Sequence, residues 1–391
     1  MVNANAGNVA KSMAEEITSM KIAFLVSSLK KCGPTKQLFY LTSLLVENGN
    51  EVTVVTIGFE PEETLLPQFV KTNVKVIQLE MPLTVSNVRA NKLKRAFLQI
   101  KPDVVHSHLI KADFLSTLFL RKKYQRIATA RSYAFEDYSM SYGKFWGSIM
   151  SMAQMYCFKR MDGVYAVSET LSNKLRKKGV ESETIYNSID VGERNVIKSQ
   201  SADIRKSLGI DDEAIVIVSV GNLIPLKNSQ VLLEWFNEYK KGRNCYLWML
   251  GEGVQKAEFV AKYADSQTHF FGQVPNVPDY LNESNLFVSC SLSEGLPNAV
   301  LEALLHELPV VLSDIDQHKE ILSKDDRCGE LFELEKQASF TRQMEQALNR
   351  IKNGEYNPDM ARKLVEDHFD RKKMVASYME VYSRLGNRNE D

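Results

Sequence analysis

Two glutamates eight positions apart, Glu294 and Glu302, lie in the segment Ser293–Ala303, which reads SEGLPNAVLEA. This segment follows an apolar run and leads into a helical pattern, so we expect Glu294 in a strand-to-helix loop and Glu302 inside the helix. Carboxylates suit the adjacent hydroxyls of a sugar ring, and the helix start between them favours phosphate. The pair fits a ligand with hydroxyls at both ends and phosphates between, as in a nucleotide sugar. Spacing alone also permits a capping acid and an unrelated surface glutamate.

Short β-branched runs alternate with helix-length amphipathic stretches, which predicts parallel βα units. Several runs are apolar on both faces, as in a sheet covered by helices on each side. In the first half the predicted strands are Lys21–Ser28, Glu51–Ile57, Val74–Leu79, Asp103–His108, Arg126–Arg131, Gly163–Ser168 and Thr184–Tyr186. The predicted helices between them include Thr35–Glu47, Asn87–Ile100 and Lys144–Lys159.

The strand pattern stops over the polar stretch Asp190–Leu208 and then restarts. The later predicted strands are Ala214–Val220, Cys245–Leu250, His269–Val274, Leu286–Ser291, Pro309–Ser313 and Gly329–Leu334. A chain of 391 residues exceeds what one hydrophobic core usually holds, so we expect two doubly wound domains with a cleft between their strand ends. The last helical pattern runs from about Lys363 to Leu385.

We divide the chain into a flexible leader (1–19), a first Rossmann-like domain (20–195), a second (196–370) and a C-terminal helix (371–391). That helix is expected to cross back to the first domain.

Charge is distributed unevenly along a chain whose formal net charge is zero. Residues 1–195 contain 26 Lys and Arg against 18 Asp and Glu, a net charge of +8, and the remainder carries −8. A basic first half indicates an anionic partner, although solvated lysine-rich helix faces would give the same count. The five scattered cysteines, without a CxxC pair, argue for a reducing compartment and against disulfides or a zinc site.

No apolar run occurs in residues 1–19, so they are not a secretory signal. The longest apolar stretch, Phe145–Phe158, is too short to span a bilayer core of about 30 Å. We therefore expect a cytoplasmic protein, at most attached to a membrane face. Its aromatic and methionine side chains could touch lipid, but core packing is the favoured interpretation for the methionines of this stretch.

The spacing of Glu294 and Glu302 and the wording EGLPNAVLEA resemble the donor-binding motif of the retaining GT-B glycosyltransferases of family 4. The resemblance extends over almost the whole chain and implies two Rossmann-like domains facing a central cleft. It also implies that Glu294 contacts the donor sugar, with Gly295, Leu296, Pro297 and Asn298 supporting the ring. Glu302 would hold the ribose diol.

The resemblance also covers the stretch GNLIPLK, which ends at Lys227. Family members place an arginine and a lysine here to clamp the donor diphosphate. Lys227 matches the lysine, whereas Asn222 stands at the arginine position and brings no charge. Lys227 must then stabilise more of the leaving group, or another cation must enter from elsewhere. Without the resemblance, Lys227 would be interpreted as a solvated residue at a helix start.

Three further stretches match weaker family features. In the loop after the first strand, where similar proteins have two glycines near the diphosphate, this chain has Cys32 and Gly33. His108 ends the stretch DVVHSH and, by the resemblance, would contact the donor sugar. Val274 follows Phe271–Gln273 in a loop whose backbone would contact the nucleobase.

The resemblance implies catalytic roles for His108, Lys227 and Glu294 in a metal-independent hexosyl transfer without a cofactor. The Asp314-Ile-Asp316 motif is interpreted as structural. Expected partners are a nucleotide sugar, most often UDP-linked in this family, and a glycan or lipid-linked glycan acceptor. We also expect contact with an anionic membrane surface, and we expect no binding to nucleic acid.

Two alternatives remain open from the sequence. One is a different GT-B activity, such as a nucleotide-sugar epimerase or a phosphorolytic enzyme. The other is a non-catalytic, nucleotide-sugar-binding subunit of a glycan assembly complex, which the departures at Cys32 and Asn222 would permit. A dehydrogenase is disfavoured because no GxGxxG follows the first strand of either half.

Overall fold

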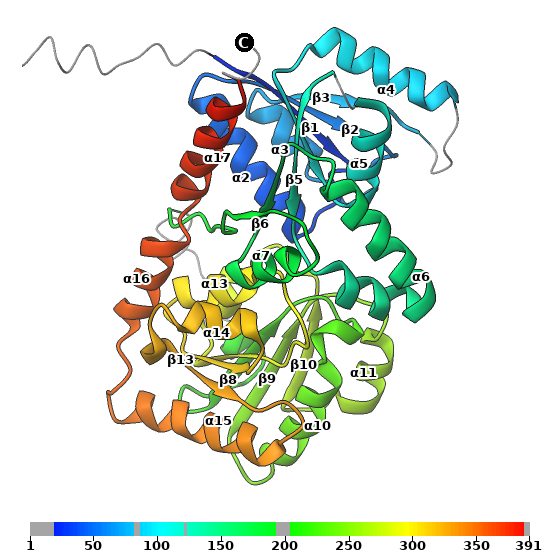
Figure 1. Cartoon of the computed structure of the whole chain (residues 1–391). Coiled ribbons are helices and arrows are strands. Elements are labelled where there is room, and N and C mark those ends of the chain that lie inside the picture. The colour runs from blue at the N-terminus through cyan, green and yellow to red at the C-terminus, as the bar shows by residue number, and fades with distance from the viewer. Residues whose placement is uncertain (1–18, 82–86, 121–122, 193–203, 387–391) are drawn as a thin grey trace, which may run out of the picture.

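The computed structural model describes residues 19–81, 87–120, 123–192 and 204–386. These residues form two parallel sheets, of seven and six strands, each flanked by helices (Figure 1). The predicted α/β class with two doubly wound halves is confirmed. The predicted leader, and the boundary drawn between residues 195 and 196, fall outside the described residues.

The first sheet has the strand order β3-β2-β1-β4-β5-β6-β7. Its strands are β1 (Lys21–Val26), β2 (Glu51–Thr56), β3 (Lys75–Gln78), β4 (Val104–His108), β5 (Gln125–Ala130), β6 (Gly163–Ala166) and β7 (Glu183–Thr184). The helices connecting them are α2 (Gly33–Glu47), α3 (Leu66–Lys71), α4 (Asn87–Ile100), α5 (Ile110–Leu115), the π-helical turn η1 (Ser116–Leu120), α6 (Ala134–Phe158) and α7 (Glu169–Arg176).

The second sheet repeats this winding in the order β10-β9-β8-β11-β12-β13. Its strands are β8 (Ile215–Val220), β9 (Cys245–Leu250), β10 (Thr268–Gly272), β11 (Leu286–Ser289), β12 (Val310–Ser313) and β13 (Gly329–Phe332). Its helices are α9 (Ile204–Ser207), η2 (Pro225–Lys227), α10 (Ser229–Tyr239), α11 (Lys256–Tyr263), α12 (Val277–Asn282), α13 (Asn298–Leu305), α14 (Asp316–Leu322), η3 (Asp326–Cys328), α15 (Gln337–Lys352), α16 (Pro358–His368) and α17 (Arg371–Gly386).

The carboxyl ends of β1 and β4, and those of β8 and β11, are the points where each strand order reverses. Ligands of doubly wound sheets bind outside these ends. In Figure 1, α7, α13 and α14 lie between the two sheets. One hydrophobic cluster contains side chains of both domains, among them Ala130, Val167, Leu296 and Leu301. The two halves are therefore packed together around the place where the candidate residues converge.

Two predicted helices and one predicted polar stretch differ from the observed structure. The helix predicted at Lys144–Lys159 begins ten residues earlier, at Ala134, and is kinked at Gly143, whose φ is 79°. The pattern predicted as one helix from Lys363 to Leu385 is two helices, α16 and α17. The polar stretch Asp190–Leu208 contains the short helix α9 in its described part.

α17 packs on the first domain, beside α2 (Figure 1). Its Tyr382 hydroxyl is 2.8 Å from Nδ1 of His106, and Nε2 of the same ring is 2.7 Å from Thr129 Oγ1. Tyr378 completes the network, with its hydroxyl 2.7 Å from Thr129. Both ring nitrogens of His106 are thus hydrogen-bonded in a buried network. Nε2 of His108, two positions later, has no such partner among the described residues.

Asp113 on α5 is buried and joins three elements. It accepts hydrogen bonds from Ser107 Oγ on β4 (2.7 Å) and from Gln154 Nε2 on α6 (3.1 Å). Burial raises the pKa of Asp113 to about 7, although both hydrogen bonds oppose the shift. The carboxyl group therefore fixes α6 against the strand that ends at His108.

Because the pKa of Asp113 is higher in the folded chain than the ordinary aspartate value near 4, the folded state holds this proton to higher pH than the unfolded state. The contribution is fully present below about pH 4 and is lost as the pH rises through about 7. We expect Asp113→Asn to remove this pH dependence, so that the variant gains stability relative to the wild type between pH 5 and pH 8. The free energies of unfolding of the variant and the wild type, measured with urea at both pH values, test this. An equal difference between the two chains at both pH values would contradict it.

Candidate functional site

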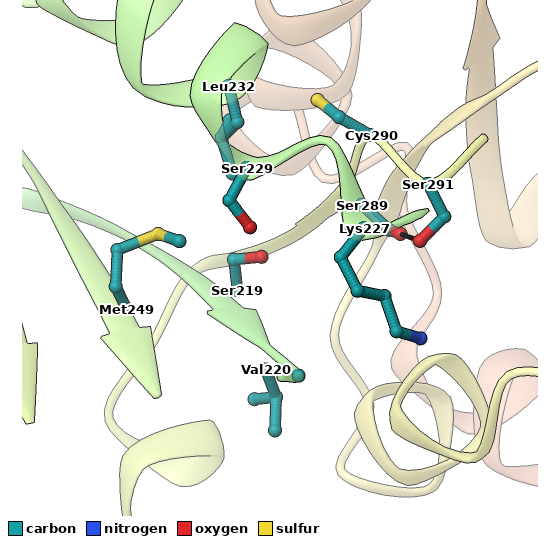
Figure 2. Close-up of a pocket in the computed structure, with 10 residues that line it drawn as sticks. Ser219, Val220, Lys227, Ser229, Leu232, Met249, Ser289, Cys290 and Ser291 are labelled. Atoms are coloured by element: carbon teal, nitrogen blue, oxygen red, sulfur yellow. Dashed lines mark hydrogen bonds between the residues drawn. The ribbon is translucent and has the colours of Figure 1, made fainter. Parts of the chain in front are cut away.

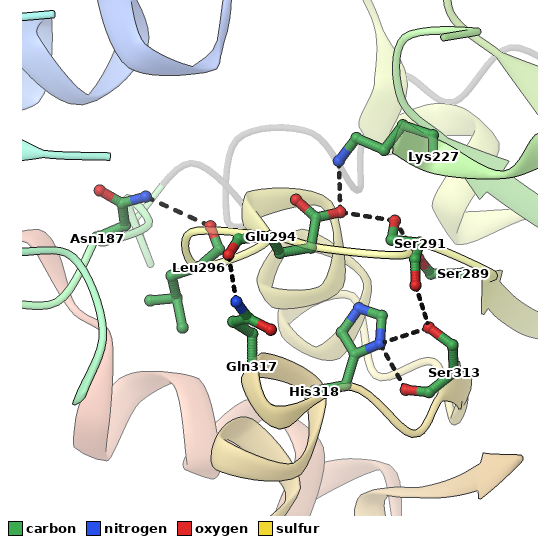
Figure 3. A network of polar contacts seen from close by, with 9 residues as sticks. All are labelled: Asn187, Lys227, Ser289, Ser291, Glu294, Leu296, Ser313, Gln317 and His318. Atoms are coloured by element: carbon green, nitrogen blue, oxygen red, sulfur yellow. Dashed lines mark hydrogen bonds and ion pairs between the residues drawn. The ribbon is translucent and has the colours of Figure 1, made fainter. Parts of the chain in front are cut away.

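Glu294 lies in the loop between β11 and α13, where it is held by side chains from its own loop, from the turn η2 and from helix α14 (Figure 3). Lys227 Nζ donates to its Oε1 at 2.5 Å, and Ser291 Oγ donates to the same oxygen at 2.7 Å. Gln317 Nε2 donates to the Glu294 carbonyl at 2.6 Å. The second carboxylate oxygen, Oε2, accepts no hydrogen bond from the described residues and is available to a ligand hydroxyl.

Burial raises the pKa of Glu294, but the Lys227 ammonium outweighs this effect and brings the pKa below its usual value. The group is therefore an anion at neutral pH and acts as an acceptor, not as an acid. Lys227 ends the 3-10 turn η2 after β8, so the ion pair joins the loops that follow two adjacent strands.

His318 lies beneath this loop and was not predicted. Its Nδ1 donates to the Ser313 carbonyl at 2.8 Å, because a carbonyl can only accept. Burial lowers the pKa of His318 to about 4, so the ring is neutral. Ser313 Oγ donates in turn to the Ser291 carbonyl at 2.7 Å. These contacts fix the loop that presents Glu294.

His108 ends β4 and is 3% exposed. Its Nδ1 accepts hydrogen bonds from Arg131 Nε (3.3 Å) and Nη2 (3.0 Å). Since guanidinium nitrogens only donate, Nδ1 carries the lone pair, and the proton of the neutral ring is on Nε2. Burial, followed by His106 and Arg131, lowers the pKa of His108 well below the ordinary value, which keeps the ring neutral. Nε2 is buried without a hydrogen-bond partner among the described residues, so it can donate to a bound ligand.

The loop from Gly295 to Asn298 is bound to the first domain. Ser168 Oγ donates to the Gly295 carbonyl at 2.7 Å. A Cβ on Gly295 would lie 1.8 Å from the Arg131 carbonyl oxygen, so only glycine fits this close approach. Leu296 is buried, and Pro297 caps α13, whose first residue is Asn298.

Asn187, which follows β7, makes three contacts, two of which join the two domains. Its Nδ2 donates to the Leu296 carbonyl (3.4 Å) and to Asn298 Oδ1 (3.2 Å). Its Oδ1 accepts from Arg131 Nη1 at 3.1 Å. This amide therefore ties the loop after Glu294 to the guanidinium that contacts His108.

Glu302 is on α13 and faces the first domain. Its Oε1 accepts from Lys36 Nζ of α2 at 3.1 Å. Gly33 is the first residue of α2, and a Cβ there would lie 3.3 Å from Asn298 Nδ2. The structure thus brings Gly33, Asn298 and Glu302 together across the cleft.

A small pocket opens at the carboxyl ends of β8 and β11 (Figure 2). Gly221, Lys227 and Ser291 are among its lining residues, and Ser291 Oγ is 3.1 Å from Ser289 Oγ. Asn222, the next residue after Gly221, is exposed. The pocket is therefore next to the ion pair of Lys227 and Glu294.

Val274 follows β10, an edge strand of the second sheet, and its side chain packs against the hydrophobic cluster that also contains Leu296. Its backbone contact with the nucleobase stays a prediction. Asp314, of the DxD motif, lies 3.7 Å from Lys319 Nζ, and Asp316 begins α14. Within the described ranges, no group of three or more His, Cys, Asp or Glu side chains could hold a metal ion.

Sequence reasoning missed Arg131, Asn187, Ser168, Lys36 and His318. The first three share a signal that could have identified them, because they are polar residues directly after parallel strands or at the first turn beyond them. The positions of His108 and Glu294 after parallel strands supported their prediction in the same way, whereas Lys227 was predicted from the resemblance. Lys36 carries no such local signal, since its partner Glu302 is far away in the sequence. The partner of His318, Ser313, is near in the sequence, but no motif indicated the pair.

The protein families and known proteins that are similar to this chain are glycosyltransferases. The family model described as Glycosyltransferase Family 4 matches residues 33–193, and the model described as Glycosyl transferases group 1 matches residues 214–350. The O-antigen biosynthesis glycosyltransferase WclY of Escherichia coli is 25% identical over 94% of this chain and 99% of its own length. N-acetyl-alpha-D-glucosaminyl L-malate synthase of Bacillus anthracis is 25% identical over 57% of this chain and 60% of its own length.

Solved structures share the arrangement of the two domains. Anabaena HepE in complex with UDP and glucose superposes with a TM-score of 0.79 at 15% identity, over 93% of this chain and 100% of that one. Sucrose-phosphate synthase of Thermosynechococcus elongatus superposes with a TM-score of 0.77 at 16% identity, over 93% and 99%. The fold is GT-B. Two family models that divide the chain between them, and a relative that matches it along nearly its full length, place it in the group 1 glycosyltransferases of family 4.

Proposed function

We propose that this chain is a retaining, metal-independent hexosyltransferase that moves a hexose or N-acetylhexosamine from a nucleotide sugar to a hydroxyl of a glycan or lipid-linked glycan. The observation that carries the proposal is Glu294, an ionised carboxylate held on one oxygen by Lys227 and Ser291 while the other oxygen stays open to the cleft. An accessible carboxylate oxygen without a partner, on a side chain that is only 10% exposed, is suited to the hydroxyls of a sugar.

The preference for UDP and for surface polysaccharide assembly is supported by similar proteins. HepE is described in complex with UDP-glucose, and WclY is a glycosyltransferase of O-antigen biosynthesis. The bound UDP-glucose and the O-antigen pathway are those of HepE and WclY, so the preference for UDP rests on this similarity.

In the proposed reaction the acceptor oxygen attacks C1 of the donor sugar on the face from which the diphosphate leaves. The C1–O bond to phosphate breaks, and a phosphate oxygen takes the acceptor proton. Glu294 orients the sugar hydroxyls, and His108 donates from Nε2 to the sugar, a contact that the 6-hydroxyl could accept. Lys227 and the start of α13 stabilise the negative charge that develops on the leaving group.

A thermal-shift panel of UDP-, GDP-, ADP- and dTDP-sugars tests the donor. One donor should raise the melting temperature, because a ligand that binds only the folded chain stabilises it. Incubation with an acceptor, followed by NMR of the product, then tests retention. Conversion of the donor without an acceptor would favour an epimerase, and binding without transfer or slow donor hydrolysis would favour a non-catalytic subunit.

We further propose that α6 rests on an anionic membrane surface. Its outward face carries large apolar side chains at helical spacing, with Phe145 71% exposed, Trp146 63% and Met152 58%. The expectation that the methionines pack in the core holds for Met155 and is wrong for Met152. Lys144 and Lys159, both exposed, lie at the two ends of this face. No helix of the described residues is long and apolar enough to cross a membrane.

We expect the double variant Phe145→Ser and Trp146→Ser to sediment less with liposomes containing anionic phospholipid, because each interfacial aromatic ring contributes apolar burial. The measurement is the bound fraction at low and at high salt. Val254→Ser removes an 84% exposed apolar side chain from the second domain and is the matched control. Equal binding of wild type and double variant, or no binding of the wild type, would refute the membrane contact.

A further inference from the structure

Arg131 directly follows β5 and carries a positive charge that no carboxylate among the described residues balances. Its hydrogen-bond partners are His108 Nδ1 and Asn187 Oδ1, both neutral. Burial lowers the pKa of Arg131, which indicates a site where a charge is poorly solvated. A half-buried cation with only neutral partners is energetically costly, and sites of this kind favour an anion.

The guanidinium has hydrogen-bonding capacity left over. Of its five N–H groups, Nε, one on Nη1 and one on Nη2 are used by His108 and Asn187. The remaining two, one on each terminal nitrogen, have no acceptor among the described residues. Two such N–H groups can bind two oxygens of one phosphate.

The position of Arg131 points to the middle of the donor. Asn187 links the guanidinium to Leu296 and Asn298, which lie between Glu294 and Glu302 in the sequence. Gly33 approaches the same segment, since a Cβ there would lie 3.3 Å from Asn298 Nδ2. If Glu294 holds the sugar and Glu302 the ribose, the diphosphate must bridge the space beside this segment.

The other cations of the site are already paired. Lys227 contacts Glu294, and Lys36 contacts Glu302. Asn222 is uncharged. His108 provides a second, independent indication of a ligand, because its buried Nε2 has no partner.

We propose that Arg131 is an anion-binding residue of the donor site, whose two free N–H groups bind oxygens of the donor diphosphate and supply the charge that Asn222 lacks. The proposal rests on the proposed function. It assigns the missing cation to the first domain, so that the diphosphate is bound from both sides of the cleft.

The test compares UDP with uridine on the full chain. In Arg131→Gln the dissociation constant for UDP, measured by calorimetry, should rise about 10- to 100-fold, as expected for a lost charge-assisted hydrogen bond. Uridine, measured by competition, should bind as it does to the wild type. Arg131→Lys should recover part of the UDP affinity. Arg384→Gln removes the same charge from an exposed ion pair on α17 and is the control.

Equal losses for UDP and uridine in Arg131→Gln would show that the residue only supports the fold of the site, and unchanged UDP affinity would overturn the proposal outright. A loss confined to UDP-glucuronate, with UDP and UDP-glucose unaffected, would place the anion on the sugar and also overturn it. If the wild type binds none of UDP, GDP, ADP and dTDP, the proposed function fails first. If the wild type binds one of these nucleotides and Arg131→Gln binds it equally well, only the inference about Arg131 is refuted.

Discussion

Glu294→Ala is expected to lower kcat of sugar transfer by on the order of 10³-fold, the scale of losing one pre-organised polar group at a reacting centre. The carboxylate is ionised, fixed by Lys227 and Ser291 on Oε1, and free on Oε2. The variant loses the acceptor for the sugar hydroxyls and leaves Lys227 unpaired. Because the Lys227 side chain is 26% exposed, water can solvate it and the fold should persist.

The chain offers a matched control for this variant. Glu330 on β13 forms an ion pair with Arg350 at 2.9 Å, and its side chain is 12% exposed, close to the 10% of Glu294. Glu330→Ala removes a comparable pair away from the cleft, so it should change the melting temperature without changing kcat. Near-normal turnover in Glu294→Ala, or an equal loss of turnover in both variants, would refute the role of Glu294.

The strands could be predicted because each is a short apolar run that forms its own local signal. Cys245–Leu250 agrees to the residue, and the other strands agree within a few residues at their ends. The strand order could not be read from any single run. It follows from packing between runs, as does the placement of β10 at an edge of the second sheet.

The break between α16 and α17 shows why the last helix was mispredicted. Phe369 and Asp370 lie inside a helical pattern, but the Ile189 amide donates to the Phe369 carbonyl at 2.8 Å and the Arg371 amide donates to the Ile189 carbonyl at 3.1 Å. Phe369 is also buried in the shared hydrophobic cluster. These contacts come from a segment about 180 positions earlier in the chain, and backbone pairing of this kind overrides local helix propensity.

The candidate site likewise contains features that the sequence indicated and features that it did not. Glu294, Lys227 and His108 were predicted because motif wording and the carboxyl ends of strands both indicated them. The sequence did not show how each side chain is held, because its hydrogen-bond partners lie across the cleft or in other loops. The tautomer of His108 is set by Arg131, and the loop after Glu294 is held by Asn187 and Ser168.

Lys227→Met should have the second largest effect, because Lys227 serves two groups at once. It neutralises Glu294 and, in the proposed reaction, the departing diphosphate. We expect kcat to fall by on the order of 10²- to 10³-fold, since the lost charge acts most strongly on the transition state. Measuring kcat and KM separately tests this, because a change in KM alone would mean that Lys227 only contributes to binding.

The pH profile separates the two roles of Lys227. Burial by itself raises the pKa of Glu294, and the ammonium group brings it below the usual value. Without Lys227 the pKa should rise, so the acidic limb of kcat/KM should move to higher pH than in the wild type. The loss that remains on the plateau above that limb then reports the leaving-group role alone. Lys240→Met, which breaks the ion pair of a buried lysine with Asp265 elsewhere in the second domain, should leave the limb in place. An unshifted limb in Lys227→Met would mean that the ion pair does not keep Glu294 charged, and full activity on the plateau would mean that the leaving phosphate is stabilised by other groups.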